Sequence, residues 1–149
     1  MKEKLLHEES GQKTFALVFD TGDEVATGLL AFAKEKGLAG SHFTAIGALN
    51  DVTLGFFDWD KKDYQKIQIN EQVEVLSLMG DIALNKGEPK VHAHVVMSKS
   101  DGTAHGGHLI EAHVRPTLEV ILVESPEHLI RKTDEASGLA LIDLEATEL

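Results

Sequence analysis

Apolar residues near the start of the chain follow two different spacings. From Thr14 to Asp20 the chain reads TFALVFD, an apolar β-forming run that predicts a buried strand. Further on, apolar residues recur at helical spacing and form one face of a predicted helix: Val25, Leu29, Leu30, Phe32 and Ala33. We expect Thr21 or Asp23 to cap the start of this helix, and Gly37 to supply the left-handed cap at its end.

After this helix the pattern predicts β-structure almost throughout. Turn residues separate runs that predict strands over 42–49, 52–58, 64–69, 73–84, 91–99, 103–114, 118–124, 128–132 and 139–142. Asn50–Asp51 is expected to join two of these strands, Gly80 to bend one, and Arg115–Pro116 to separate another two. One helix against many antiparallel strands predicts the α+β class, with a mostly antiparallel β-sheet packed against one main α-helix.

The length and composition favour a single domain over residues 1–149. The chain shows no linker, low-complexity tract or clear internal repeat, and we expect flexible ends at about 1–10 and 145–149. The absence of cysteine excludes disulfides and thiolate metal sites, and it favours a cytoplasmic location. The first residues lack the apolar stretch of a signal peptide, and no apolar run is long enough to cross a bilayer, so we expect no membrane partner.

The charge balance is strongly acidic. Lys and Arg number 14 and Asp and Glu number 25, which gives a formal net charge of −11. Proteins that hold DNA usually present a basic surface, and the densest basic spot here is Lys61–Lys62, which is flanked by Asp60 and Asp63. Binding of nucleic acid by this domain alone is therefore disfavoured.

Candidate chemistry is concentrated in one histidine-rich stretch. Five of the eight histidines lie between Val91 and His113. His92 and His94 are two residues apart on a predicted strand, so their side chains share one face of the sheet. Whether His108 joins them depends on the register of the predicted hairpin.

Two registers are open for this hairpin. If Asp101–Gly102 formed a two-residue turn, His108 would point to the other face of the sheet. If Ser100 also belonged to the loop, His94 would lie opposite His108. The three-residue loop needs its last residue in the left-handed region, and Gly102 occupies that position, which favours this register. A bulge at Gly106–Gly107 could change the count.

In the favoured register three imidazoles converge. Three neutral nitrogen ligands with an open fourth position suit Zn²⁺, and also other borderline divalent metals. The alternative is that the His-x-His pair is only a polar strand face. His105 and His113 fall on the opposite face, where we expect surface or supporting groups. The remaining histidines are isolated and receive a structural interpretation: His7, His42 and His128.

Four segments, two of them in the histidine-rich stretch, together resemble a known family. They are EVLSLMG from Glu74, HAHVVMSKSDG from His92, GGHLIEAHV from Gly106 and TLEVILVE from Thr117. In this order they resemble the PPC (plants and prokaryotes conserved) domain family in its stand-alone prokaryotic form, and the resemblance spans nearly the whole chain. It implies an antiparallel sheet packed on one helix, a homotrimer, and a metal site at the positions of His92, His94 and His108.

Plant relatives in this family join the domain to AT-hook segments that enter the DNA minor groove. This chain has no Arg-Gly-Arg-Pro core and no basic arm, and the plant-type Gly-Arg-Phe-Glu-Ile-Leu stretch appears over 71–76 without its arginine.

Three functions follow from these features. The first is a trimeric metal-binding module whose open metal position holds a small anionic ligand. The second is a metal-dependent hydrolase or lyase, with Glu74, His105 or Glu111 as candidate general base. The third is a DNA-associated regulator.

Overall fold

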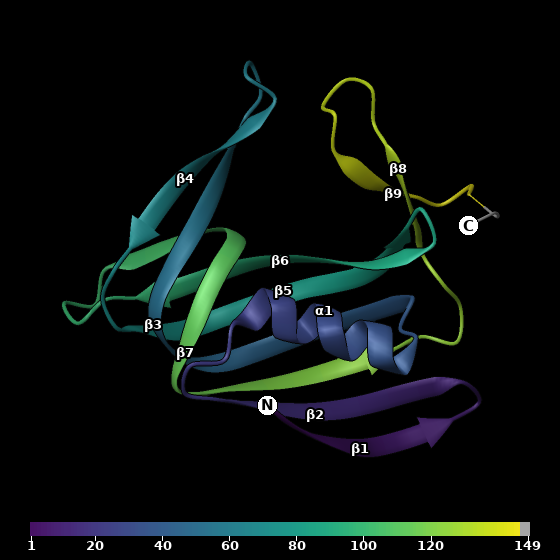
Figure 1. Cartoon of the computed structure of the whole chain (residues 1–149), viewed down its shortest axis with the longest axis horizontal. Coiled ribbons are helices and arrows are strands. Elements are labelled where there is room, and N and C mark those ends of the chain that lie inside the picture. The colour runs from purple at the N-terminus through teal and green to yellow at the C-terminus, as the bar shows by residue number, and fades with distance from the viewer. Residues whose placement is uncertain (147–149) are drawn as a thin grey trace.

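The computed structural model describes residues 1–146, which form nine strands and one helix (Figure 1). The helix is α1 (Val25–Lys36), and the strands are β1 (Lys2–Glu9), β2 (Gln12–Asp20), β3 (Gly40–Asp58), β4 (Asp63–Ile69), β5 (Val73–Asn85), β6 (Glu88–Ser98), β7 (Ala104–Glu124), β8 (Ile130–Thr133) and β9 (Ala140–Asp143). The described part is mostly β-sheet with a single helix, and it is more β-rich than the predicted α+β class implies.

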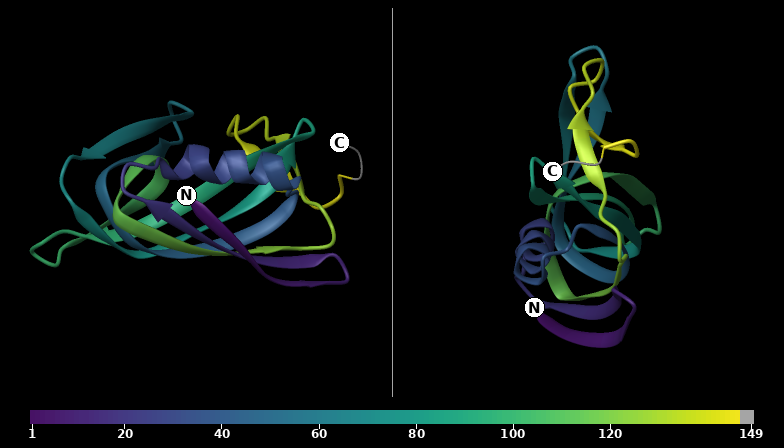
Figure 2. Two further views of the ribbon diagram at one scale, coloured as in Figure 1. Left: turned by 60° about the horizontal axis from the view of Figure 1, so that its bottom comes forward. Right: turned by 90° about the vertical axis from the view of Figure 1, so that its right-hand side faces the viewer.

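The strands form one curled sheet. Its order is β1-β2-β7-β3-β5-β8-β9, with β4 added on β3 and β6 joining β5 to β7. All neighbours are antiparallel except β5 and β8. Because β3 and β6 each pair with both β5 and β7, these four strands close into a small barrel-like ring, and Figure 2 shows the resulting curvature.

Helix α1 packs against the sheet and completes the core. It contacts β6 and β7, and its buried residues are Val25, Leu29, Phe32 and Ala33, four of the five that the spacing predicts. The fifth, Leu30, is only half-buried. The ring of Phe32 meets that of Phe15 edge to face at a centroid distance of 5.2 Å. The residues of the core come from β2, β3, β4, β5, β6 and β7, from the helix, and from Leu38 just after it. The core therefore fixes β6 and β7, the two strands that carry the histidine cluster.

The predicted end of the helix is confirmed, but its predicted start is wrong. Gly37 adopts φ 65°, the left-handed cap. At the other end the N-cap is Glu24, whose carboxylate accepts hydrogen bonds from the backbone N–H groups of Ala26 and Thr27. The same carboxylate accepts a hydrogen bond of 3.1 Å from the N–H of Ala112 in β7, which ties the helix to the sheet. This contact between distant segments explains why glutamate replaces the shorter capping residues.

Two strands are longer than the pattern predicts. β3 runs through Asn50–Asp51, and the ladder with β7 shifts register on either side of Leu49, so a bulge bends the strand without ending it. β7 runs through Arg115–Pro116, at residues that have no partner in the ladder with β3. Proline is tolerated there because its missing N–H is not required.

The predicted flexible start is replaced by a strand. Residues 2–9 form β1, which pairs with β2 through a turn in which Ser10 and Gly11 have positive φ. β1 is exposed along its whole length, so it carries no apolar alternation from which a strand could be predicted. Of the expected flexible end over 145–149, residues 147–149 lie outside the described part.

Candidate metal centre

The hairpin of β6 and β7 has the register that brings the histidines together. The backbone N–H of Lys99 donates to the carbonyl of Thr103 at 3.0 Å, and Gly102 adopts φ 80°. His94 is consequently paired with His108. The three-residue loop predicted from the position of Gly102 is confirmed.

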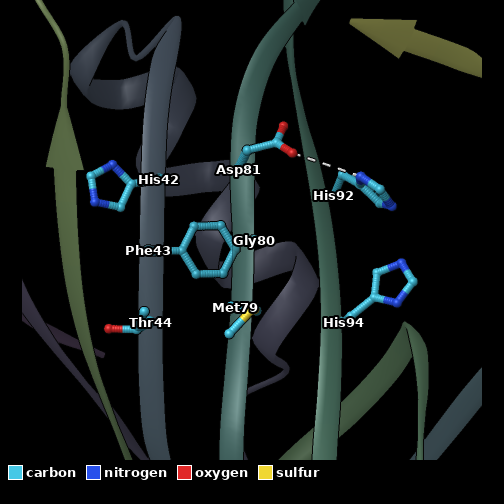
Figure 3. Close-up of a pocket in the computed structure, with 8 residues that line it drawn as sticks. All are labelled: His42, Phe43, Thr44, Met79, Gly80, Asp81, His92 and His94. Atoms are coloured by element: carbon cyan, nitrogen blue, oxygen red, sulfur yellow. Dashed lines mark ion pairs between the residues drawn. The ribbon is translucent and has the colours of Figure 1, made fainter.

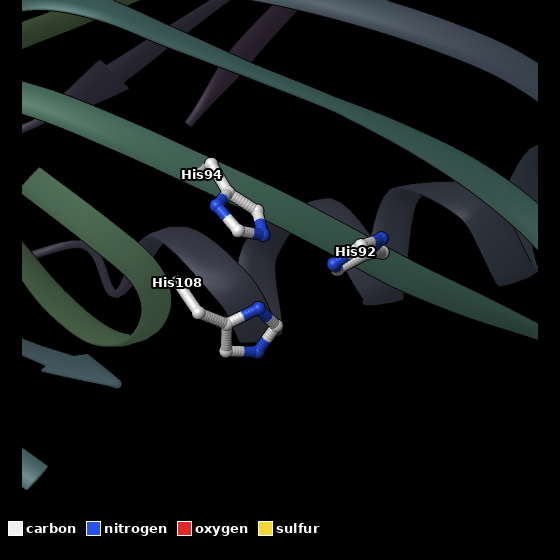
Figure 4. A group of neighbouring side chains, drawn as sticks. All are labelled: His92, His94 and His108. Carbon is white, nitrogen blue, oxygen red and sulfur yellow. The ribbon is translucent and has the colours of Figure 1, made fainter. Parts of the chain in front are cut away.

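The three imidazoles form a compact cluster (Figure 4). His92 and His94 come from β6 and His108 from β7, and each offers one nitrogen such that these atoms all lie within 4.8 Å of one another. The ring centroids are 5.1 to 5.4 Å apart. Nδ1 of His108 is buried and has no hydrogen-bond partner among the described residues. This donor set and the unpartnered nitrogen fit a divalent transition metal.

The surroundings of the cluster favour the neutral form of two of its imidazoles, those of His94 and His108. Burial lowers the pKa of His108 to about 4, and the nearby His92, His94 and Lys90 add to this effect. Burial also lowers the pKa of His94, again with a contribution from His92. A neutral imidazole has a free nitrogen lone pair, which is the form that binds a metal.

The low pKa of His108 predicts a loss of stability in acid for the metal-free protein. The unfolded chain binds this proton near pH 6.5 and the folded chain near pH 4, so the unfolded state is favoured as pH falls through this window. Urea unfolding of chelator-treated protein at about pH 7 and about pH 5 measures the loss. The His108→Asn variant should lose less stability than wild type, and the exposed His128→Asn should lose as much. An equal loss in the His108 variant would contradict the assignment.

A carboxylate and a guanidinium lie behind His92. Oδ2 of Asp81 is 3.7 Å from Nδ1 of His92, and its Oδ1 accepts a short hydrogen bond from Arg131 of β8. Burial raises the pKa of Asp81, but His92 and Arg131 together lower it further than burial raises it, so the carboxylate is ionised. Sequence reasoning missed both residues. Asp81 lies opposite His92 in the ladder of β5 and β6, so a prediction of that pairing would have found it.

The two glycines before His108 serve the packing of neighbouring strands. A side chain at Gly107 would meet the carbonyl oxygen of Gly55 at 3.0 Å, and one at Gly106 would meet that of Val95 at 2.9 Å. The ring of Tyr64 stacks on His108 at a centroid distance of 4.6 Å. These contacts hold the His108 ring in place, which is a requirement for a metal ligand.

The other candidate residues lie apart from the cluster. His105 is exposed. In the ladder of β6 and β7 it is paired with the buried Met97, so it lies on the face of the sheet opposite to that of His94. Nδ1 of His113 lies 2.8 Å from Oδ1 of Asp51, a contact within hydrogen-bond range. Two candidate bases, Glu74 and Glu111, are exposed and pair in their ladders with residues outside the cluster.

Among the described residues the potential metal-binding group contains only the three predicted histidines. His7 and His128 are exposed and also stand outside it.

An open hollow of about 450 Å³ lies on the outer face of the sheet beside the cluster (Figure 3). The side chains of Thr44, Met79, His92 and His94 line it, together with His42. Gly80 lies at its floor, where a side chain would meet the carbonyl oxygen of His92 at 2.3 Å. His42, interpreted from sequence as structural, lines this hollow from β3, across β5 from the cluster.

The structure is that of a small, mostly β domain with a curled sheet and a single helix. It carries a cluster of three histidines on two adjacent strands. The chain belongs to the Plants and Prokaryotes Conserved (PCC) domain family, whose model matches residues 6–126. The resemblance found in the sequence motifs is therefore confirmed.

Several solved structures are similar to this chain. A metal-containing protein from Archaeoglobus fulgidus is 37% identical with a TM-score of 0.81, over 87% of this chain and 92% of that one. A plant- and prokaryote-conserved (PPC) protein from Pyrococcus horikoshii is 32% identical with a TM-score of 0.82, over 99% of this chain and 97% of that one. A proposed DNA-binding protein from Bacteroides thetaiotaomicron is 27% identical with a TM-score of 0.86, over 97% of this chain and 99% of that one.

One curated relative is a much longer protein. The bifunctional protein GlmU of a Synechococcus strain is 30% identical over 127 residues, which are 83% of this chain. The chain spans only 19% of the length of that relative. Within residues 1–146, no helix has the length and apolar character needed to cross a membrane.

Proposed function

We propose that this protein binds a divalent transition metal, with Zn²⁺ as the best match to the donor set, through His92, His94 and His108. The observation that carries this proposal is the convergence of three imidazole nitrogens within 4.8 Å on two adjacent strands. The Archaeoglobus relative, described as metal-containing, supports it. Three protein ligands leave an open position on the metal, which we assign to a small anion or water. A cysteine-free protein with histidine ligands suits the cytoplasm, where we place it.

Metal analysis of the purified protein tests this function. Protein stripped with a chelator and then dialysed against Zn²⁺ should retain about one ion per chain. The bound metal should also raise the melting temperature, because it binds only the folded state. Failure to retain any divalent metal at neutral pH would contradict the proposal.

We propose a binding module in preference to a hydrolase or lyase. An enzyme of either kind would need a general base near the metal. The three candidates from sequence, Glu74, His105 and Glu111, lie outside the histidine cluster. The site therefore supports metal and ligand binding more directly than catalysis.

We propose that the protein is a homotrimer that buries the outer face of its sheet. Large apolar side chains are exposed there: Ile46, Leu76, Met79, Val96 and Ile121. Met79 and Ile121 are both paired with Thr44, so they lie in one row across three strands. A subunit contact would remove this apolar surface from water. The number three comes from the family resemblance.

Light scattering tests the assembly. The wild-type mass should be three times the chain mass of 16.2 kDa at micromolar concentration. A charge in the apolar row, as in Met79→Lys, should dissociate the trimer because it would be buried without a partner. Leu5→Lys places the same charge on the distant exposed strand β1 and should leave the trimer intact. A monomeric wild-type protein would rule out this assembly.

We expect that this protein alone does not bind duplex DNA specifically. A net charge of −11 repels a polyanion, and a bound divalent metal adds only about two charges per chain. The likeness to a proposed DNA-binding protein makes this expectation worth testing. The test is a fluorescence anisotropy titration with duplex DNA at roughly physiological salt and with competitor DNA, because non-specific binding grows at low salt. Sub-micromolar binding with a sequence preference would contradict the expectation.

A further inference from the structure

A second, smaller cavity touches the histidine cluster from the other side. It has a volume of about 130 Å³ and lies between the β3–β4 hairpin, β6, β7 and the β8–β9 hairpin. Figure 1 shows the two hairpins rising from the same side of the sheet. His92 and His108 both line the cavity, so it borders the proposed metal position. The β8–β9 hairpin follows the last residue matched by the family model.

One nitrogen donor of this cavity, on the side chain of Arg131, lacks a partner. The side chain of Arg131 is 4% exposed, donates through one terminal nitrogen to the carbonyl of Ala140 at 2.9 Å, and pairs through the other with Asp81. Its Nε–H is buried and has no hydrogen-bond partner among the described residues. Buried donors are nearly always satisfied, so an unpartnered N–H beside a cavity indicates a bound group that accepts a hydrogen bond.

The charge of the cavity selects an anion. Lys90 lines it and forms no ion pair within residues 1–146, while the charge of Arg131 is already balanced by Asp81. No acidic side chain is among the residues that line it in the described part of the chain. A divalent metal and Lys90 together would leave the cavity with a positive charge that no protein group neutralises.

The remaining walls are apolar. They consist of the ring of Tyr64 and the side chains of Val91, Leu139 and Leu141. Inorganic oxyanions are hydrated on all sides and gain nothing from such walls, whereas a short hydrocarbon chain does. The cavity volume of about 130 Å³ is that of a few water molecules, so the cavity holds an anion of a few heavy atoms and is too small for a nucleotide.

We propose that this cavity binds a small aliphatic carboxylate. Its carboxylate group would be held by Lys90, Nε of Arg131 and the open metal position, and its carbon chain would contact Tyr64 and Leu141. This assignment rests on the proposed metal-binding function and names the class of anion that the site takes. The β8–β9 hairpin, which supplies Arg131 and Leu141, sets the preference for that class.

Cobalt(II) provides the test, because its visible spectrum changes when an anion joins its coordination shell. The Co²⁺-loaded protein is titrated with butyrate, formate and inorganic phosphate. Butyrate should change the spectrum at lower concentration than phosphate. Lys90→Met should weaken butyrate binding by about tenfold, the effect expected for one lost charge-assisted hydrogen bond. Lys4→Met removes the same charge from exposed β1 and should bind as wild type does.

A third variant isolates the apolar wall. Leu141→Ser should weaken butyrate binding and leave formate binding unchanged, since formate has no carbon chain. Equal affinities in the Lys90 and Lys4 variants, an unchanged cobalt spectrum, or tighter binding of phosphate than of butyrate would each overturn the carboxylate assignment while the metal site stands. A wild-type protein that takes up no Co²⁺ or Zn²⁺ would instead overturn the proposed function, and the carboxylate assignment with it.

Discussion

Replacing His94 by alanine is expected to abolish metal binding. His94 lies opposite His108 across the hairpin and next to His92 along β6, so its removal leaves two imidazoles to hold the ion. Two neutral ligands do not complete a zinc site, which takes at least three from the protein. At a metal concentration of about 1,000 Kd the wild type gains about 4 kcal/mol of stability from the ion, and the variant should lose this gain entirely. Metal content and melting temperature, each with and without Zn²⁺, measure the two effects.

The matched control is another histidine removed from the surface. His128 is exposed and lies before β8, outside the cluster, so His128→Ala should bind metal as wild type does. The metal-free His94 variant should fold normally, because the His94 side chain is exposed in the single chain and is not part of the hydrophobic core. Full metal occupancy in folded His94→Ala would exclude these histidines as the ligands.

The histidine cluster could be predicted because all of its determinants are local. His92 and His94 share a face through the two-residue period of a strand, and Gly102 selects the loop that places His108 opposite His94. All three residues lie within one hairpin. No pairing between distant segments had to be known.

The parts of the site that could not be predicted come from segments far apart in the chain. Arg131 reaches Asp81 across 50 residues, and Tyr64 stacks on His108 from a different hairpin. Nothing in the local pattern around these residues distinguishes them from surface charges and aromatics. Their roles follow from the pairing of β8 with β5 and of β4 with β3, which joins segments far apart in the chain to the strands around the site.

The fold shows the same division. The buried face of α1 and its cap at Gly37 follow from residues close in sequence, and both were predicted. The cap at Glu24 and the continuity of β3 through Asn50–Asp51 depend on contacts with β7, and both were missed. β1 is exposed throughout and is held by its hydrogen bonds to β2, so burial left no signal in its sequence.

Replacing Asp81 by asparagine is expected to lower metal affinity by about 10- to 100-fold, the usual effect of removing a carboxylate that supports a histidine ligand. The negative charge of Asp81 lies 3.7 Å from Nδ1 of His92, where it stabilises the ring with that nitrogen protonated and the other free to bind the ion. Asparagine keeps an oxygen for Arg131, so the buried guanidinium retains an acceptor. Affinity is measured by competition with a chromophoric chelator, and folding by circular dichroism.

The chain supplies a closely matched control for this last change. Asp51 stands beside His113 as Asp81 stands beside His92, with Oδ1 of Asp51 2.8 Å from Nδ1 of His113, but this pair lies outside the cluster. Asp51→Asn therefore removes the same charge from the same kind of carboxylate–histidine pair and should leave metal affinity unchanged. If Asp81→Asn bound metal as tightly as Asp51→Asn, the orientation of His92 would have to come from the strand alone. The carboxylate would then serve only to neutralise the buried charge of Arg131.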